Sequence, residues 1–565
     1  MSADPARGPA PASVPHEKPV DPKSDDPKPA EAKPAETKAP ESAPEPTVLI
    51  EDKKRLSESL IWQLQRDFYA SQGPTAWKPR GEGGVPFYIT SNPHIARSYA
   101  RVFTGVLRDL LPVLQPGEPV YFIELAAGSG QFSYLHLKNL LRSKAALPAL
   151  RDVPIRYVMT DFAQRNLDAW AKNKRLAELV EQGVLDFALF DMERDHEIRL
   201  VNAQQTIAAG SCKNPLLAIA NYAFDTTVQD AFFVKDGALS EAVASVLSTQ
   251  AEKDLGDTAI LGRSKLRFET AALKGDRYED AALNRVLQRY AQRLNNTCFL
   301  LPTGALHAVR TLRAWSGERL FLLSADKAFS YEEDLLSRGD AGFTFHGGSV
   351  SMTVNFHALG ADFEEAGGAA WQSLPRSARL HVCGLACGVP ELAEGRLAFE
   401  ETMNGFGPAA YVKLLSDLRK EWTEPSLEAA AALLRLCTWD PEILSGLRPS
   451  LKKHLPTASE SMKIEMLAAL RHAWDNFYPM QYDLPFDLAG FCMMMKEPRE
   501  ALFYLQQSEL LYGEHYLTHL RAGLAHAQLG ETDAAMARVV TALALNPTHT
   551  SSRELKIRLE ARRTS

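Results

Sequence analysis

Hydrophobic and polar positions change pattern twice between Val120 and Leu141. An apolar run, Val120–Ile123, ends in an acid, Glu124, and small residues occupy positions 126–130. An apolar-periodic stretch then runs from Phe132. This order predicts a buried strand, a tight turn and a helix, which together open a nucleotide-binding α/β sheet. Small residues let the backbone approach a ligand closely, and the helix start offers unpaired N–H groups.

Three further apolar runs also end in polar residues. They are Ile155–Asp161, Val184–Phe190 followed by Asp191, and Pro215–Asn221. We expect parallel strands of one sheet, whose polar ends gather at the same edge. A carboxylate in the place of Asp161, at the end of the second strand, usually holds a ribose diol by charge-assisted hydrogen bonds. A dinucleotide-binding loop would instead read G-x-G-x-x-G/A, and Ser133 occupies its last position here.

The strand ending E-L-x-x-G-x-G at 124–130 resembles motif I of class I S-adenosylmethionine-dependent methyltransferases. In that family the loop faces the methionine end of the cofactor and the acid of the second strand binds the ribose. The acid of the third strand, followed by an apolar residue, flanks the adenine. The resemblance therefore implies an α/β Rossmann-like methyltransferase fold with S-adenosyl-L-methionine as the cofactor. The implied cofactor-binding residues are Glu124, Ala126, Gly128, Gly130, Asp161, Phe162, Asp191 and Met192.

A narrower resemblance, to the MidA-like family, covers about residues 60–390. The matching segments are Tyr88–Phe103 (Y-x-T-S-x-x-I), Asn221–Asp225 (N-E-x-x-D-A), Leu301–Gly304 (L-P-x-G) and Ser349–Phe356 (D-L-T-x-x-V-D-F). These methyltransferases are linked to assembly of mitochondrial respiratory complex I, and their implied activity is methylation of a protein arginine. The resemblance implies further cofactor contacts from Ser91 and Asn221.

Class I methyltransferases place substrate-positioning groups at the end of the fourth strand. Asn221 and Asp225 are therefore the candidate catalytic residues, with Asp225 accepting a proton or a substrate hydrogen bond. Asp225 would alternatively cap a following helix, because Asp-Thr-Thr-Val precedes an apolar run. Tyr88 and Tyr222 are candidate walls of the substrate pocket, with core packing as the alternative.

Several positions depart from the family pattern. Ala126 replaces a glycine, which is tolerable only if its φ stays below zero. Tyr222 replaces a glutamate, segment 320–327 lacks the family's D-Y-G, and Ser349 and Asn355 replace acids. Because carboxylates are the natural partners of guanidinium groups, these losses weaken the case for a cationic substrate. Two alternatives stay open: a catalytically degenerate scaffold that works by interaction, and a methyltransferase acting on a small molecule or natural product.

Shifts in pattern divide the chain into segments. Residues 1–47 form a Pro/Ala/Lys/Glu tail with too few apolar side chains to order. We expect a helical cap at 48–115, the methyltransferase domain at 116–395 and a helical domain at 396–565. A helical insertion is expected over 226–318, because apolar residues from Tyr278 to Leu294 recur at helical spacing. The remaining strands are expected at 319–324, 349–356 and 379–386.

Two C-terminal segments, 482–515 and 516–549, repeat at a period of 34 residues. Ala501 and Ala535 occupy equivalent places, and Gly530 lies at the turn between the helices of the second unit. Small residues there let paired helices pack closely, as in the tetratricopeptide (TPR) repeat, which both segments resemble. That resemblance implies a protein or peptide acceptor bound by this domain. A plain helical bundle is the alternative.

Composition narrows the remaining function classes. The 565 residues carry a net charge of −7, which favours neither nucleic acid nor anionic membranes as partners. No apolar run approaches the ~20 residues that span a bilayer, and the start lacks the apolar region of a signal peptide. Six scattered cysteines indicate a reduced compartment, so we expect a cytoplasmic protein. His381, Cys383 and Cys387 lack an evident fourth ligand, so we expect no metal there.

Overall fold

The computed structural model describes residues 47–564 except 78–84, 86, 274, 340, 347, 375–379, 423, 480 and 481. The predicted tail therefore lies, up to residue 46, outside the described residues.

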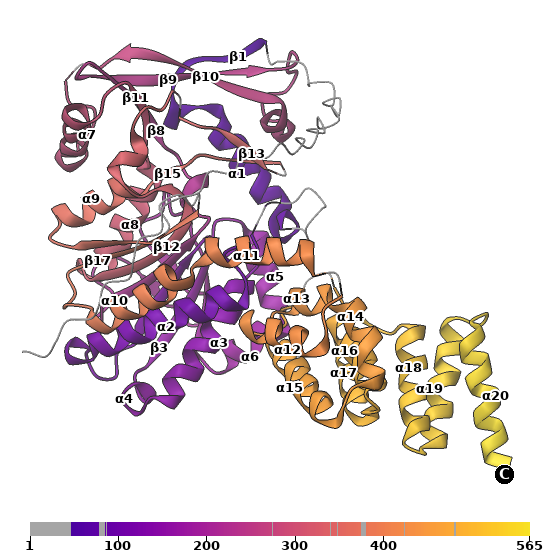
Figure 1. Cartoon of the computed structure of the whole chain (residues 1–565). Helices are drawn as coiled ribbons and strands as arrows, with labels where there is room; N and C mark the ends of the chain where they lie inside the picture. The colour runs from indigo at the N-terminus through magenta and orange to yellow at the C-terminus, as the bar shows by residue number, and fades with distance from the viewer. Residues whose placement is uncertain are drawn as a thin grey trace, which may run out of the picture. The chain divides into compact units, whose positions relative to one another are not determined.

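A mixed sheet forms the centre of the α/β part (Figure 1), in the order β4-β3-β2-β7-β12-β17-β16, with β15 paired to β12. Strands β4, β3, β2, β7 and β12 are parallel, and β17 is antiparallel to both of its neighbours. The strands are β2 (Val120–Leu125), β3 (Ile155–Asp161), β4 (Leu185–Leu189), β7 (Leu216–Asn221), β12 (Leu320–Phe329), β15 (Val354–Asn355), β16 (Ala369–Gln372) and β17 (Leu380–Cys387). The predicted α/β sheet is confirmed.

One predicted strand of this sheet, 349–356, is right only in part, because of its residues only Val354 and Asn355 pair with β12. The segment 349–356 contains β14 (Ser349–Ser351), which pairs only with β13 (Thr344–His346), and then the two-residue strand β15. Helix α9 (Phe356–Glu365) begins at the last of these residues, with the Asn355 side chain accepting from the Ala358 N–H. The chain enters the edge of the sheet later, at β16.

The order of the strands reverses beside β2. Strands β3 and β4 continue from β2 in one direction, whereas β7 and β12 continue in the other. In open α/β sheets, ligands bind in the crevice outside the carboxyl ends of the strands at such a switch point. The fold therefore places the candidate site at the ends of β2 and β7.

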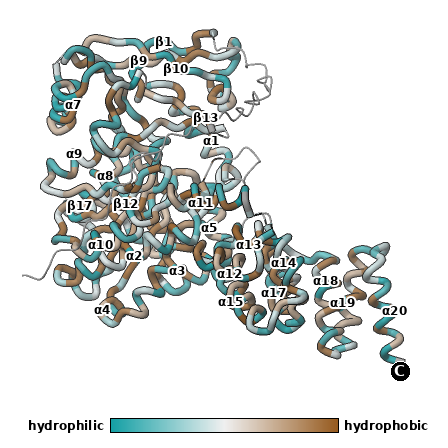
Figure 2. Tube along the Cα trace, in the orientation of Figure 1, coloured by the Kyte–Doolittle hydropathy of each residue, from teal (hydrophilic) through white to brown (hydrophobic). Residues whose placement is uncertain are grey.

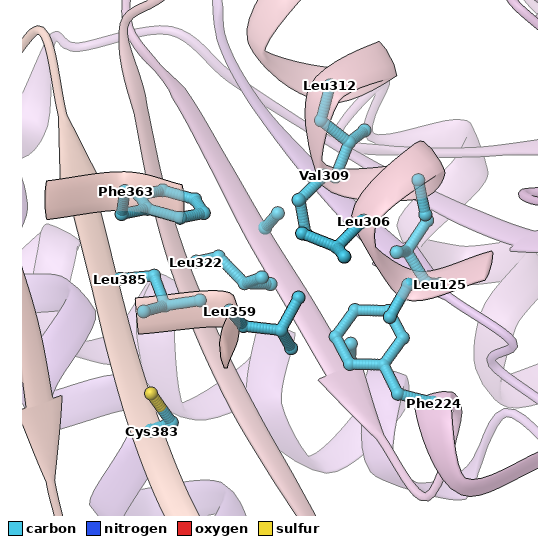
Figure 3. Packing of buried hydrophobic residues seen from close by; sticks show 14 of the residues in the cluster. Leu125, Phe224, Leu306, Val309, Leu312, Leu322, Leu359, Phe363, Cys383 and Leu385 are labelled. Carbon is cyan, nitrogen blue, oxygen red and sulfur yellow. The ribbon is translucent and has the colours of Figure 1, made fainter. Parts of the chain in front are cut away.

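Helices α8 (Thr303–Trp315) and α9 pack on one face of the sheet (Figure 3). Leu306, Val309 and Leu312 recur every three residues along α8 and are buried with Leu125 and Leu322 of the strands. Helices α2 (Pro93–Leu110) and α3 (Gln131–Ala146) belong to the second large apolar cluster, which contains the other side chains of the sheet. Burial of both faces explains why the strands read as continuous apolar runs.

A second sheet is antiparallel, in the order β1-β9-β8-β11, with β10 paired to β9. Its strands are β1 (Val48–Arg55), β8 (Asp230–Lys235), β9 (Ala238–Ser248), β10 (Ser264–Ala272) and β11 (Thr297–Leu301). The predicted helical insertion over 226–318 is therefore wrong, although α7 (Ala281–Arg293) and α8 are helices. The predicted helical cap likewise begins with strand β1, before α1 (Leu60–Gln72). Val48 of β1 pairs with Ser248 of β9, far along the chain, so local periodicity does not reveal the place of β1 in this sheet.

The described elements after β17 are all helical. They are α10 (Ala393–Phe399), α11 (Pro408–Glu421), α12 (Leu427–Leu436), α13 (Pro441–Gly446), α14 (Arg448–His454), α15 (Glu460–Asn476), α16 (Leu484–Met494), α17 (Pro498–Tyr512), α18 (Tyr516–Gln528), α19 (Thr532–Leu545) and α20 (Thr550–Thr564), with short 3-10 and π turns between some of them. The predicted boundary at 395/396 falls inside α10, which packs against α2.

Helices α16 and α17 pair, as do α18 and α19, which matches the two predicted 34-residue units. Ala501 and Ala535 are fully buried, and a Cβ atom on Gly523 would lie 2.9 Å from the Val539 side chain. Small residues thus permit close packing of these helices. The last helix, α20, is mainly hydrophilic (Figure 2), and its Leu555 and Leu559 cover the apolar side of the last pair.

Candidate functional site

A cavity lies at the carboxyl ends of β2, β3, β4 and β7, at the switch point of the sheet. The lining residues that the sequence predicted are Ser91, Glu124, Ala126, Gly128, Asp161, Phe162, Asp191, Met192, Asn221 and Tyr222. Tyr88, Gly130 and Asp225 are predicted site residues that do not line it. The tertiary structure therefore brings together the ends of four strands that are far apart in the chain.

Residues 126–130, the glycine loop, join β2 to α3 through left-handed backbone. Gly128 and Gly130 have φ of 55° and 80°, and Ala126 has φ of 49°. The expectation that Ala126 keeps φ below zero is therefore wrong. The Ala127 N–H donates to the Thr160 carbonyl at 2.9 Å, which ties the loop to the end of β3. An alanine in this region is strained by its Cβ, so the surroundings must hold it there.

Glu124 lies under the glycine loop, and its side chain accepts hydrogen bonds from two buried hydroxyl groups. Its Oε2 accepts hydrogen bonds from the hydroxyls of Ser133 at 2.5 Å and Tyr157 at 2.7 Å. Burial raises the pKa of the Glu124 carboxyl to about 7, against the smaller lowering effect of these two donors. A carboxyl with this pKa changes charge near neutral pH, so a cationic group beside it would favour the ionised form.

Asp161 joins the end of β3 to the glycine loop. Its Oδ2 accepts from the Gly128 N–H at 3.2 Å, and its Oδ1 accepts from the Ala163 N–H at 2.9 Å. Burial raises the pKa of Asp161, while these backbone donors lower it. The side chain therefore shapes the loop as well as lining the cavity.

Asp191 is paired with an arginine that sequence reasoning did not identify. Arg66 of α1 forms ion pairs with Asp191 and, at 3.0 Å, with Glu193. Its guanidinium also lies 4.9 Å from the centre of the Phe162 ring. Because α1 precedes the sheet by about 50 residues, only a match of charge between Arg66 and the strand-end acids could have indicated this contact.

The same N-terminal segment supplies further lining residues that the sequence reasoning missed, among them Gln65, Tyr69 and Trp77. The rings of Tyr69 and Trp77 are stacked, with centres 6.3 Å apart. A Cβ atom added to Gly128 would lie 2.8 Å from the Trp77 indole. Only a glycine at 128 lets the loop and the indole approach this closely.

Among the buried side-chain polar atoms of the cavity lining, two have no hydrogen-bond partner within the described residues. They are Asn166 Oδ1 and Asn221 Nδ2, both buried. The Tyr99 hydroxyl donates to Asn221 Oδ1 at 3.0 Å and so fixes the orientation of that amide. A buried acceptor and a buried donor left unsatisfied are costly unless a ligand uses them. The free acceptor on Asn166 and the free donor on Asn221 fit a ligand that carries hydroxyl or amino donors and also an acceptor.

Tyr222 and Asp225 follow β7. Tyr222 lines the cavity with φ of 48°, and burial raises the pKa of its hydroxyl well above the ordinary value. Asp225 lies in a 3-10 turn, Phe224–Thr226, that precedes strand β8, so the alternative that it caps a helix is wrong. The N–H groups of Phe224 and Asp225 donate to Asp326 Oδ2 at 2.9 and 3.2 Å. Burial of the two acids together raises the pKa of both.

Tyr88 and Gly130 contact non-helical residues of the C-terminal helical domain instead of lining the cavity. The Tyr88 hydroxyl donates to Asp440 Oδ2 at 2.6 Å, in a buried position, so the prediction that Tyr88 forms a pocket wall is wrong. A Cβ atom on Gly130 would lie 2.8 Å from both Met159 and the Tyr478 hydroxyl. Gly130 is therefore required for packing behind the loop.

The described residues hold no group of three or more His, Cys, Asp or Glu side chains arranged to bind a metal. Cys383 is buried in β17, and burial raises the pKa of its thiol. Within the described part of the chain no helix is both long and apolar enough to cross a membrane.

No protein-family model matches this chain, and no curated protein does. Among solved structures, an uncharacterized superfamily protein from Burkholderia thailandensis is 14% identical, with a TM-score of 0.35, over 60% of this chain and 94% of that one. Another, a superfamily member and "likely methyl transferase" from the same organism bound to S-adenosyl-homocysteine, is 14% identical, with a TM-score of 0.36, over 61% and 96%. YrrB, a TPR protein with an unusual peptide-binding site, is 20% identical, with a TM-score of 0.22, over 30% and 83%. At such scores the function has to be argued from the chain's own site.

Proposed function

We propose that the protein is an S-adenosylmethionine-dependent methyltransferase of the class I fold. The observation that carries this proposal is the convergence of Glu124, Asp161 and Asp191, each at a different strand end, on one cavity beside the glycine loop. Their order along the sheet is that of the methionine, ribose and adenine contacts implied by the resemblance to class I enzymes. Acids at successive strand ends, together with the small residues of the glycine loop at this switch point, are what a nucleoside ligand requires.

The residues of the cavity fit the cofactor in the following roles. Asp161 would accept hydrogen bonds from the ribose hydroxyls, Asp191 and Met192 would flank the base, and Glu124 would hold the end of the ligand that carries the amino group. When bound, S-adenosylmethionine supplies a methyl group activated on a sulfonium. Trp77 packs against Gly128 of the glycine loop and Tyr69 stacks on Trp77, so both would limit the access of water to the cavity. Protein side chains then mainly place the acceptor for an in-line displacement.

Asn221 is the residue that we assign to acceptor positioning, because its amide is fixed by Tyr99 and its Nδ2 has no other partner among the described residues. Asp225 lies outside the cavity lining, so any role in proton transfer is indirect. Tyr222 lines the cavity and would contact the acceptor.

We further propose that the acceptor is a protein or peptide bound by the TPR-like helix pairs α16/α17 and α18/α19. Side chains on these helices expose apolar surface: Phe503 is 44%, Leu510 54% and Val540 49% exposed. Exposed apolar residues on paired helices are suited to holding an extended or helical segment of a partner.

Calorimetric titration of the full chain with S-adenosylmethionine and S-adenosylhomocysteine tests the cofactor. We expect both to bind the wild type, and Gly128→Ala to weaken binding at least tenfold, because its Cβ would collide with Trp77. Gly210→Ala is the matched control, since Gly210 has φ of 73° but no atom within 4 Å of the added Cβ. If the wild type binds neither ligand, the enzyme proposal fails.

The alternative, a degenerate scaffold, is favoured by one observation. Ala126 and Tyr222, which both line the cavity, have left-handed backbone without being glycine, and both depart from the family pattern. The same titration decides between the two, because a scaffold would bind neither ligand and Gly128→Ala would change nothing.

A further inference from the structure

The glycine loop is touched directly by the C-terminal helical domain. Tyr478 follows α15, and its hydroxyl donates to the Ser129 carbonyl at 2.9 Å. The side chain is 7% exposed and lies against Gly130. A residue nearly 350 positions further along the chain thus forms a hydrogen bond with the middle of the loop.

The loop has positive φ at Ala126, Gly128 and Gly130, and at Ala126 this backbone is strained. Backbone of this kind persists where the surroundings determine it. Two aromatic side chains hold its carbonyls: Trp170 Nε1 of α5 (Gln164–Lys172) donates to Gly128 O at 2.9 Å, and Tyr478 donates to Ser129 O. Because C=O and N–H point in opposite directions across a trans peptide, these two bonds also orient the N–H groups of Ser129 and Gly130.

Neighbouring side chains of the α/β part donate hydrogen bonds to the end of α15 instead of to the loop. The Tyr134 hydroxyl of α3 donates to the Asp475 carbonyl at 2.9 Å. Arg175 of α6 (Lys174–Glu181) donates to the Trp474 carbonyl at 3.1 Å, and its guanidinium lies 4.2 Å from the centre of the Trp474 ring. Tyr134 therefore forms the same kind of bond as Tyr478, across the same interface, but with its acceptor on the helical domain.

We propose that Tyr478 is a positioning residue through which the C-terminal helical domain sets the shape of the glycine loop, and so the affinity for the cofactor. The part that concerns the cofactor rests on the proposed function. Cofactor binding and the shape of the glycine loop are then coupled, so a partner that moves the end of α15 changes the affinity for the cofactor. The coupling is reciprocal, so the cofactor changes the affinity for that partner by the same factor.

The test compares Tyr478→Phe with Tyr134→Phe in the full chain, since each removes one hydroxyl from the interface. The first readout is hydrogen exchange of the loop amides in the protein without ligand. The second is the dissociation constant for S-adenosylhomocysteine. We expect Tyr478→Phe to speed exchange in the loop and to weaken binding about three- to tenfold, the range for one lost hydrogen bond. Tyr134→Phe should leave both readouts within twofold of the wild type.

Equal effects of the two variants would overturn the proposal, because they would show a general loss of interface stability. No effect of Tyr478→Phe on loop exchange would also overturn it. If the wild type fails to bind S-adenosylhomocysteine, the proposed function fails, yet the exchange measurement still decides whether Tyr478 holds the loop.

Discussion

The hydroxyl of Tyr88 and the carboxylate of Asp440 form a buried hydrogen bond of 2.6 Å that links the segment before α2 to the start of α13. Asp440 also caps α13, because its Oδ1 accepts from the Glu442 N–H at 2.8 Å. Burial raises the pKa of the Asp440 carboxyl to about 7. The helical domain and the α/β part are therefore joined by a group that titrates near neutral pH.

This pKa predicts a pH-dependent stability. Because the folded-state pKa lies above the ordinary value, Asp440 contributes most at acidic pH, and its contribution is lost as the pH rises through about 7. Relative to Asp440→Asn, the wild type should lose about 2–4 kcal/mol of unfolding free energy between about pH 4 and pH 8. Denaturant titrations at several pH values measure the difference. Comparing the wild type with Asp440→Asn at each pH cancels the effects of other titrating groups on the unfolding free energy. One such group is His136, whose pKa burial lowers to about 3, so its effect on stability has the opposite dependence on pH. A difference that does not change with pH would contradict the prediction.

Ala126→Gly should stabilise the protein. Relief of the left-handed strain is worth about 1–2 kcal/mol, and the greater freedom of glycine in the unfolded chain offsets about half of that. Ala127, next in the chain, is the control: its φ is not positive, so Ala127→Gly should destabilise. Thermal unfolding shows whether each variant is more or less stable than the wild type. If stability changes in the same direction in both variants, strain at Ala126 is not the cause.

Asp161→Ala should weaken S-adenosylhomocysteine binding by about 1.5–3 kcal/mol, because it removes a charged acceptor from the cavity and from the Gly128 N–H. Asp168→Ala is the control, since that exposed side chain of α5 accepts from Gln164. Calorimetry gives both constants. An unchanged dissociation constant in a folded Asp161→Ala protein would mean that the acid at the end of β3 does not bind the ribose.

Removal of the C-terminal helices should leave a folded protein when the chain is cut before residue 515, and an insoluble product when it is cut before residue 396. Deleting 396–565 cuts α10, where a Cβ atom on Gly395 would lie 2.5 Å from Val106, and removes Asp440 and Tyr478. We expect an insoluble product. Deleting 515–565 removes α18–α20, whose apolar residues form mainly a cluster of their own, and should leave a folded protein that binds the cofactor. Solubility and calorimetry test both, and a soluble 1–395 fragment with wild-type affinity would contradict this.

The sequence determined the central strands, and the reason is local. A strand buried on both faces is a continuous apolar run, so 120–123, 155–161 and 215–221 could be placed before any contact was known. Glu124, Asp161 and Asp191 followed from the same runs, because each stands at or just beyond a strand end. The 34-residue spacing of small residues likewise predicted the helix pairs of the C-terminal domain.

Only the tertiary structure decided what surrounds these strand ends. Arg66 pairs with Asp191, Trp77 covers Gly128, and Tyr478 holds Ser129, although each pair is far apart in the chain. In the second sheet, β9 pairs with its chain neighbours β8 and β10 and also with the distant β1, and the place of β1 could not be read from local pattern. Local periodicity reports which side of an element is buried, but not which partner buries it. That choice comes from packing and charge matching between distant segments, which only the folded chain brings together.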